Sequence, residues 1–302
     1  MKNKNAFDVI IIGGSYAGLS AAMALGRSLR KVLIIDSGLP CNRQTPHSHN
    51  FITLDGEKPA NITAKAKEQV LQYNTISFYE GIAVKGEKKD SYFSVLTHNS
   101  DVFYAKKLIF ATGIKDVFPD IKGFSDCWGI SVVHCPYCHG YEVRGKKTAI
   151  LAQGERAFHL ASLVNNLTQD ITLITSDRHL FTKEQLQKLE NHTIRIIDKE
   201  IIEVIHVKGY LSQLVFIDGS REDFEAVYAA IPFQQNCTIP VELGCEITEM
   251  GHLKVDGFQK TTVSGIYTCG DTSSMMRSVA TAVASGNICG AMVNMELINE
   301  EF

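Results

Sequence analysis

The sequence lacks several features that would each indicate a class of protein. Its 30 basic and 33 acidic residues leave a formal net charge of only −3, and no run of Lys and Arg suggests a nucleic-acid partner. Eight cysteines among 302 residues are too few for a disulfide scaffold, and no segment is of low complexity. The remaining composition, with 45% hydrophobic residues, is that of a soluble globular chain with room for two domains.

A long uninterrupted hydrophobic segment is also missing. No charge falls between Asp8 and Arg27, and Lys2 and Lys4 precede this stretch, as they would in a signal peptide or a membrane span. Asp8 and the turn at residues 13–16 interrupt the apolar run, and a second strand-like run follows directly. We therefore expect a cytoplasmic protein with no membrane partner.

The N-terminal stretch has the pattern of a strand, a turn, a helix and a second strand. The strand at 9–12 leads into the turn GGSYAG (13–18), a helix over 19–29 and a strand that ends at Asp36. A glycine-rich turn that opens a helix binds pyrophosphate, and an acid at the end of the next strand accepts hydrogen bonds from ribose. Ser15 occupies the middle glycine position of this fingerprint, so close approach to a ligand falls to Gly14 or to a slightly shifted backbone.

A second unit of the same kind starts at Lys147, and strands then alternate with helical segments up to residue 232. Near the C-terminus, a short strand ends at Gly270-Asp271 and precedes a long helix that starts near Arg277. The repeated unit predicts an α/β fold with two Rossmann-like, three-layer nucleotide-binding domains. The last strand and helix suggest that the chain returns to its first domain.

The string CPYCH (135–139) suits three chemistries. Haem attachment through C-x-x-C-H requires export, and no export signal is visible. Structural zinc needs two more ligands, and Cys127 and His134 lie nearby without a second paired motif. A redox dithiol needs only a pair at a helix start, where Pro136 would suit the first turn. The flavin context described next favours the dithiol.

Four stretches, in order, are similar to those of the low-molecular-weight thioredoxin reductase family: VIIIGGSYAG (9–18), LIFATG (108–113), CPYCHG (135–140) and IYTCGDTSSMMRSVATAVASGNICG (266–290). The resemblance spans nearly the whole chain. It implies a discontinuous FAD domain formed by residues 1–113 and 243–302. It also implies an inserted NAD(P)H-type domain over 114–242 that carries the cysteine pair, and a homodimer.

The resemblance assigns roles to the dithiol. Cys138 would face the flavin, and Cys135 would exchange with a dithiol or disulfide substrate, either a small molecule or a thioredoxin-like protein. His139 stands where the reductases usually have Asp, as in a branch of FAD-dependent dithiol oxidases in which a histidine deprotonates the thiol. The catalytic residues are thus expected to be Cys135, Cys138 and His139.

The cluster CNRQTPHSHNF (41–51) contains two histidines, but no third metal ligand follows at a firm spacing. We expect this loop to lie over the flavin, and we expect no metal. The residues expected to bind FAD are Gly13, Gly14, Ser15, Ala17, Gly18, Asp36, Asn42, Arg43, Thr112, Gly113, Gly270, Asp271, Arg277 and Ser278.

The second glycine turn departs from the family's NADPH pattern. Ala152 replaces the first glycine, Glu155 places a carboxylate where a pyrophosphate would lie, and Asp177 stands where basic residues would hold a 2′-phosphate, although Arg178 is near. We expect FAD as cofactor and a dithiol oxidase, or a disulfide reductase supplied by another reductant. The alternatives are an NADPH-dependent thioredoxin reductase with divergent contacts, another ligand at this turn, and a flavin-bound redox sensor or partner-binding module.

Overall fold

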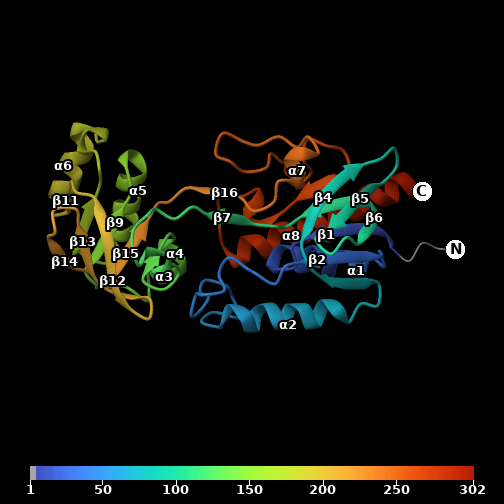
Figure 1. Cartoon of the computed structure of the whole chain (residues 1–302), viewed down its shortest axis with the longest axis horizontal. Helices are drawn as coiled ribbons and strands as arrows, with labels where there is room; N and C mark the ends of the chain where they lie inside the picture. Colours follow the sequence, from blue (N-terminus) through green and yellow to red (C-terminus); the bar gives the residue numbers. More distant parts are fainter. Residues whose placement is uncertain (1–4) are drawn as a thin grey trace.

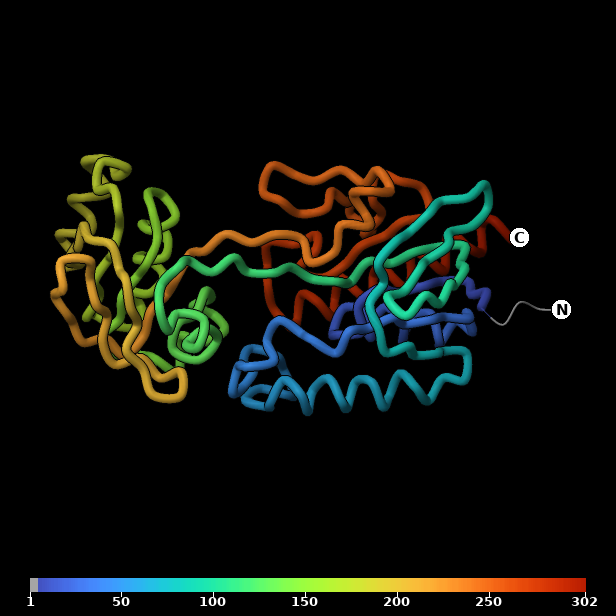
Figure 2. Tube along the Cα trace, in the orientation of Figure 1, coloured from blue at the N-terminus to red at the C-terminus, as the bar shows by residue number. Residues whose placement is uncertain are grey.

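The computed structural model describes residues 5–302, which form two bodies joined by a pair of antiparallel strands (Figure 1). β7 (Ile114–Asp116) leads out of the first body and β16 (Phe233–Gln235) leads back, and the two strands pair with each other. Figure 2 follows both crossings and shows that the C-terminus lies in the same body as the first described strand. The first body is therefore made from both ends of the chain.

A mixed sheet of order β3-β2-β1-β6-β5-β4 forms the centre of the first body, and β17 also pairs with β6. The strands β3, β2, β1, β6 and β17 run parallel, whereas β5 is antiparallel to both β4 and β6. Their bounds are β1 (Ala6–Ile12), β2 (Val32–Asp36), β3 (Ile76–Glu80), β4 (Ala83–Lys88), β5 (Phe93–Thr97), β6 (Val102–Phe110) and β17 (Ile266–Thr268).

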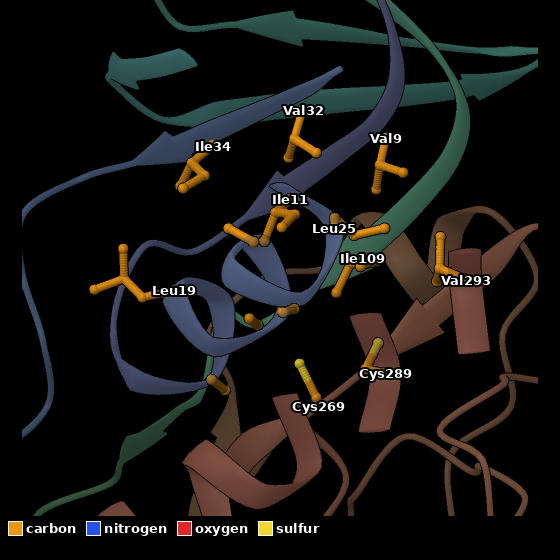
Figure 3. Packing of buried hydrophobic residues seen from close by; sticks show 14 of the residues in the cluster. Val9, Ile11, Leu19, Leu25, Val32, Ile34, Ile109, Cys269, Cys289 and Val293 are labelled. Atoms are coloured by element: carbon orange, nitrogen blue, oxygen red, sulfur yellow. The ribbon is translucent and has the colours of Figure 1, made fainter. Parts of the chain in front are cut away.

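The helices α1 and α8 pack against each other beside this sheet (Figure 3). Their contact is close because small residues meet: a Cβ added to Gly286 would lie 2.2 Å from the carbonyl oxygen of Ala17, and one added to Gly290 would lie 2.5 Å from that of Ala21. The helices of this body are α1 (Tyr16–Arg27), α2 (Pro59–Leu71), α7 (Ile239–Glu242), the 3₁₀ turn η2 (Gly270–Thr272) and α8 (Val279–Glu301).

The second body contains a parallel sheet of order β11-β10-β9-β15-β8. One hydrophobic cluster joins α5 and α6 to this sheet, and another joins it to a three-stranded antiparallel sheet, β12-β13-β14. The elements are α3 (Phe124–Cys127), β8 (Val132–Val133), α4 (Pro136–His139), β9 (Thr148–Leu151), α5 (Gly154–Val164), β10 (Ile171–Ile174), η1 (Arg178–Leu180), α6 (Lys183–Asn191), β11 (Arg195–Ile197), β12 (Ile201–Val207), β13 (Tyr210–Phe216), β14 (Arg221–Asp223) and β15 (Ala226–Ala229).

The sequence-based fold class is confirmed, with one local correction. The alternation of strands and helices expected up to residue 232 is wrong over 201–223, where the chain forms the antiparallel sheet instead. Its first turn has Lys208 at φ 52° and Gly209 at φ 83°, which is the backbone of a tight hairpin. Within residues 5–302, no helix is both long and apolar enough to cross a membrane.

Candidate active site

The first glycine turn sits between β1 and α1 and is built by close backbone packing. Gly13 has φ 105°, and a Cβ there would lie 2.2 Å from the carbonyl oxygen of Ala111. A Cβ on Gly18 would lie 1.8 Å from the carbonyl oxygen of Gly13. Ser15 is the N-cap of α1, and its side chain does not cap the helix. The N–H groups of the first turn of α1 can therefore serve an anion.

Several of the other residues expected to bind FAD meet this turn. Asp36, at the end of β2, accepts hydrogen bonds from the backbone N–H of Gly14 (2.8 Å) and of Gly38 (3.0 Å). A Cβ on Gly270 would lie 3.0 Å from that of Ala17, which places the C-terminal strand end against α1. The backbone N–H of Gly113 likewise donates to Oγ1 of Thr272 (3.0 Å), beside Asp271.

Three of the residues expected to contact FAD each carry a buried polar atom that has no hydrogen-bond partner among the described residues: Oδ1 of Asn42, Oγ1 of Thr112 and Nε of Arg277. The other amide atom of Asn42, Nδ2, donates to the hydroxyl of Tyr16 (3.1 Å). Because buried polar groups are nearly always paired, these atoms are suited to a bound polar ligand.

Two of the residues expected to bind FAD make hydrogen bonds within their own segment of the chain. Arg43 is exposed, and its guanidinium donates to the carbonyl oxygen of Pro40 (3.2 Å) within its own loop. The hydroxyl of Ser278 caps α8 by accepting a hydrogen bond from the backbone N–H of Thr281 (3.1 Å). The structure therefore gives Ser278 a folding role and leaves Arg43 at the surface.

The cysteine pair lies on the second body, where Cys135 is the N-cap of α4 and Pro136 is at the start of that helix. The backbone N–H groups of Cys138 and His139 both donate to the carbonyl oxygen of Cys135 (3.2 Å each). The thiol of Cys138 points to the first body, where it donates to the carbonyl oxygen of Arg277 (3.9 Å). The dithiol thus lies at the junction of the two bodies.

The two thiols differ in acidity. A hydrogen bond from Cys138 lowers the pKa of Cys135 to about 7, and the backbone N–H groups of Cys138 and Tyr137 and the charge of Arg277 act in the same direction against burial. The same hydrogen bond, together with burial, raises the pKa of Cys138 well above its ordinary value. Cys135 is therefore the sulfur that ionises first and can attack or leave as a thiolate.

An ion pair and a tryptophan join the bodies next to the dithiol. The guanidinium of Arg277 makes two hydrogen bonds to the carboxylate of Asp116 on β7 (2.9 and 3.0 Å), and Nε of Arg277 lies 3.7 Å from Oδ2 of Asp271. The indole Nε1 of Trp128 donates to the same Asp116 carboxylate (3.2 Å), and its carbonyl oxygen accepts from the Gln44 amide (2.5 Å). These contacts connect the first body, the crossing strand and the second body.

Two histidines flank the cysteines, and both are kept neutral. Burial lowers the pKa of His139 below its ordinary value, although Glu142 partly opposes this. Burial lowers the pKa of His134 to about 3, and its ring stacks on Trp128 with centroids 5.8 Å apart. Nδ1 of His139 and Nε2 of His134 are buried without a hydrogen-bond partner among residues 5–302. In the same part of the chain, no group of acidic, histidine and cysteine side chains has the arrangement of a metal site.

Residues of the second glycine turn form hydrogen bonds with the end of the neighbouring strand. The side-chain carbonyl of Gln153 accepts a hydrogen bond from Oγ1 of Thr175 (2.5 Å) and one from the backbone N–H of Ser176 (3.3 Å). These bonds tie the turn to the end of β10, the strand end where the family holds the 2′-phosphate of NADPH. Gln153 is the N-cap of α5, and its side chain does not cap that helix.

Two further features at the start of α5 oppose the binding of an anion. Oε2 of Glu155, in the first turn of the helix, accepts a hydrogen bond from the Gln185 amide (2.5 Å), which holds the carboxylate near the helix N-terminus. A Cβ on Gly154 would lie 3.4 Å from Cβ of Leu180, so η1 covers the backbone of this glycine. An anion at this turn would meet a carboxylate and a leucine.

Sequence reasoning missed several of these residues. Asp116, Trp128 and Gln44 belong to no motif, and they are brought together only by the docking of the two bodies. The one available signal was that Trp128 is the single tryptophan of the chain. Tyr228 lies in an apolar strand whose sequence contains no functional motif.

A cysteine pair at the junction of two Rossmann-like bodies, one of which carries a nucleotide-type glycine turn, defines a flavin-type disulfide oxidoreductase. Residues 7–286 match the family model for pyridine nucleotide-disulphide oxidoreductases, and the chain belongs to this family. Within it, the chain resembles the thioredoxin reductases. It is 34% identical to thioredoxin reductase tcpT of Claviceps purpurea over 99% of this chain and 96% of that one.

A second relative, thioredoxin reductase sirT of Leptosphaeria maculans, is 31% identical over 98% of this chain and 95% of its own. Among solved structures, thioredoxin reductase TrxB of Bacillus anthracis superposes with a TM-score of 0.93 at 28% identity, covering 98% of this chain and all of that one. The protein is thus an enzyme of the thioredoxin reductase-like type, and the flavin used by this type is FAD. The buried atoms of Asn42, Thr112 and Arg277 that lack a hydrogen-bond partner among the described residues fit such a polar cofactor.

Proposed function

We propose that the protein passes electrons between FAD and a dithiol or disulfide substrate through Cys135 and Cys138, without taking them from NADPH. The closed second turn carries this proposal. Gln153 bonds to the end of β10, Leu180 covers Gly154, and Glu155 places a negative charge at the helix start. A dinucleotide would have to break these bonds and overcome the repulsion before it could bind.

The cysteines carry out the exchange in the oxidase direction. A substrate thiolate attacks Sγ of Cys135 in the Cys135–Cys138 disulfide, which forms a mixed disulfide and releases Cys138 as the leaving thiolate. The second substrate thiolate then attacks the substrate sulfur of the mixed disulfide, and Cys135 leaves with the electron pair of the broken bond. The substrate has lost two electrons and two protons, and the enzyme holds them as a dithiol.

Bound FAD supplies the chemistry that the dithiol lacks, because it accepts an electron pair from thiols and can pass it to oxygen. Cys138 is suited to face the flavin because its thiol already points to Arg277 of the first body (3.9 Å to the carbonyl oxygen). His139 is suited to take the thiol proton, since its buried imidazole is neutral and Nδ1 is unpaired. Glu142, which raises the pKa of His139, would favour the imidazolium that results.

An anaerobic absorbance experiment tests the proposal. Mixing the FAD-loaded enzyme with NADPH or NADH should leave the visible flavin band unchanged, whereas excess dithiothreitol should bleach it. In the matched control, Cys138→Ser should show the same flavin band, and dithiothreitol should no longer bleach it. Fast bleaching by NADPH would show the protein to be a nucleotide-dependent reductase with divergent contacts.

Steady-state oxygen uptake separates the remaining candidates. Continuous uptake with a dithiol, lost in Cys138→Ser, supports the oxidase, whereas a single reduction without turnover supports a redox sensor or a reductase supplied by another donor. The thioredoxin reductases among the relatives support a thioredoxin-like protein or a small dithiol as the substrate. We also infer from the resemblance that the enzyme works as a homodimer in the cytoplasm, which size-exclusion chromatography and localisation of the tagged protein test.

A further inference from the structure

Tyr228 on β15 carries the most unusual polar group near the dithiol that the proposed chemistry does not use. The residue is 0% exposed, and among residues 5–302 its hydroxyl has no hydrogen-bond partner. A buried hydroxyl without a partner costs free energy, so fold stability alone would favour phenylalanine at this position. The hydroxyl therefore calls for a partner that is formed in another state of the protein.

The sheet places Tyr228 beside the strand that leads into the cysteine pair. β15 pairs in parallel with β8, where Tyr228 is in register with Val133, two residues before Cys135. Val133 and Val143, which bracket the C-x-x-C segment, belong to the same hydrophobic cluster as Tyr228, and this cluster includes the inner face of α5. α4, which carries the cysteines, packs on α5. The phenol and the dithiol therefore share one side of the second sheet.

The electrostatics of the site agree with this placement. After burial, the group that raises the pKa of Tyr228 most is Cys135, followed by Glu142 and Cys138. Burial and the nearby cysteines raise the pKa of the phenol above its ordinary value, so the group keeps its proton and can donate a hydrogen bond. Besides Tyr228, the titratable groups that act on Cys135 include Cys138 and Arg277.

We propose that the Tyr228 hydroxyl donates a hydrogen bond to the Cys135 sulfur when that sulfur becomes a thiolate, so that Tyr228 stabilises Cys135 as a leaving group. The inference rests on the proposed thiol/disulfide function. When the mixed disulfide breaks, the electron pair of the sulfur–sulfur bond ends on Sγ of Cys135. A hydroxyl that donates to this atom lowers the free-energy cost of that charge. Hydrogen bonds to charged groups are about twice as strong as neutral ones.

Alkylation of the protein after anaerobic reduction with dithiothreitol tests this inference without NADPH and without turnover. The rate of iodoacetamide labelling of Cys135, followed by peptide mass spectrometry across pH, gives the thiolate midpoint. Tyr228→Phe should raise this midpoint by about one pH unit, a tenfold change in the thiolate equilibrium. Cys41, a free thiol of the first body, is an internal reference, and its midpoint should not move although burial raises its pKa to about 11. Tyr141→Phe removes an exposed phenol close to the cysteines and is the matched control.

An unchanged Cys135 midpoint in Tyr228→Phe, or an equal shift of Cys41, would overturn the inference. The variant should fold, since phenylalanine keeps the ring contacts and removes only an unpaired hydroxyl. An independent measurement uses the unsubstituted protein labelled with ring-¹³C tyrosine, in which the infrared difference between the disulfide and dithiol forms should show one tyrosine C–O band that moves. A spectrum with no such band would also overturn it. Neither outcome bears on the NADPH test, so the two proposals can fail separately.

Discussion

Asp116→Asn tests the contact that holds the two bodies together beside the dithiol. The substitution removes the negative charge but keeps an oxygen that can accept from Trp128. Asp116 and Arg277 are largely shielded from solvent, with side chains 8% and 17% exposed, and two hydrogen bonds join them. Removing one partner of a buried ion pair costs about 3–5 kcal/mol, because the other charge stays buried. Asp271, 3.7 Å from Nε of Arg277, compensates in part, so we expect about 3 kcal/mol.

The single tryptophan makes the assay selective. Trp128 donates to the Asp116 carboxylate, so its fluorescence in increasing urea reports separation and unfolding at this contact. Glu203→Gln is the matched control, because Glu203 pairs in the same body with Lys122, whose side chain is 79% exposed. This control should cost less than about 1 kcal/mol. A loss in Asp116→Asn no larger than in the control, with an unchanged emission maximum, would refute the role given to the ion pair.

Two further predictions concern the flavin end of the site. Gly18→Ala would place a Cβ 1.8 Å from the carbonyl oxygen of Gly13, so we expect the FAD-to-protein ratio after purification to fall sharply, while Gly257→Ala, which meets no atom within 4 Å, should keep it. Burial, opposed by Arg277 and assisted by Asp116, raises the pKa of Asp271 to about 6, above the ordinary value near 4. The folded state therefore binds this proton more tightly. Its contribution is present below pH 4 and is lost as pH rises through 6, by about 3 kcal/mol in all. Asp271→Asn should remove that loss when the urea midpoints of the two proteins are compared from pH 4 to pH 7, and parallel midpoints would contradict the assignment.

The different acidities of the two cysteines suit them to different roles. Cys135, with a pKa lowered to about 7, can attack and leave as a thiolate near neutral pH, whereas Cys138 holds its proton until a base takes it. The neutral imidazole of His139 is the base closest to Cys138 in the chain. This division agrees with an exchanging Cys135 and a flavin-facing Cys138, which remain predictions until the variants are measured.

The α/β class, the glycine turn at 13–18 and the cysteine pair at 135 and 138 could be predicted from the sequence because each depends on residues close together in the chain. A run of buried β-branched residues makes a parallel strand, and glycines followed by a helical period make a turn. The second turn could also be recognised as altered, since Ala152 and Glu155 stand at expected contacts. The antiparallel sheet at 201–223 was missed because short apolar runs do not distinguish strands from helices without their partners.

The tertiary structure alone decided how these pieces meet. Asp116 and Arg277 are 161 positions apart, and no local pattern marks either as the partner of the other. Gln153 closes its own turn only because β10 ends where its amide can reach Thr175. In the sequence Tyr228 is an ordinary strand residue, and only the register with Val133 places it beside the strand that leads to the cysteines. Sequence patterns specify local geometry and which face is apolar, whereas the packing of sheets and the docking of domains determine which distant polar groups come within hydrogen-bonding reach.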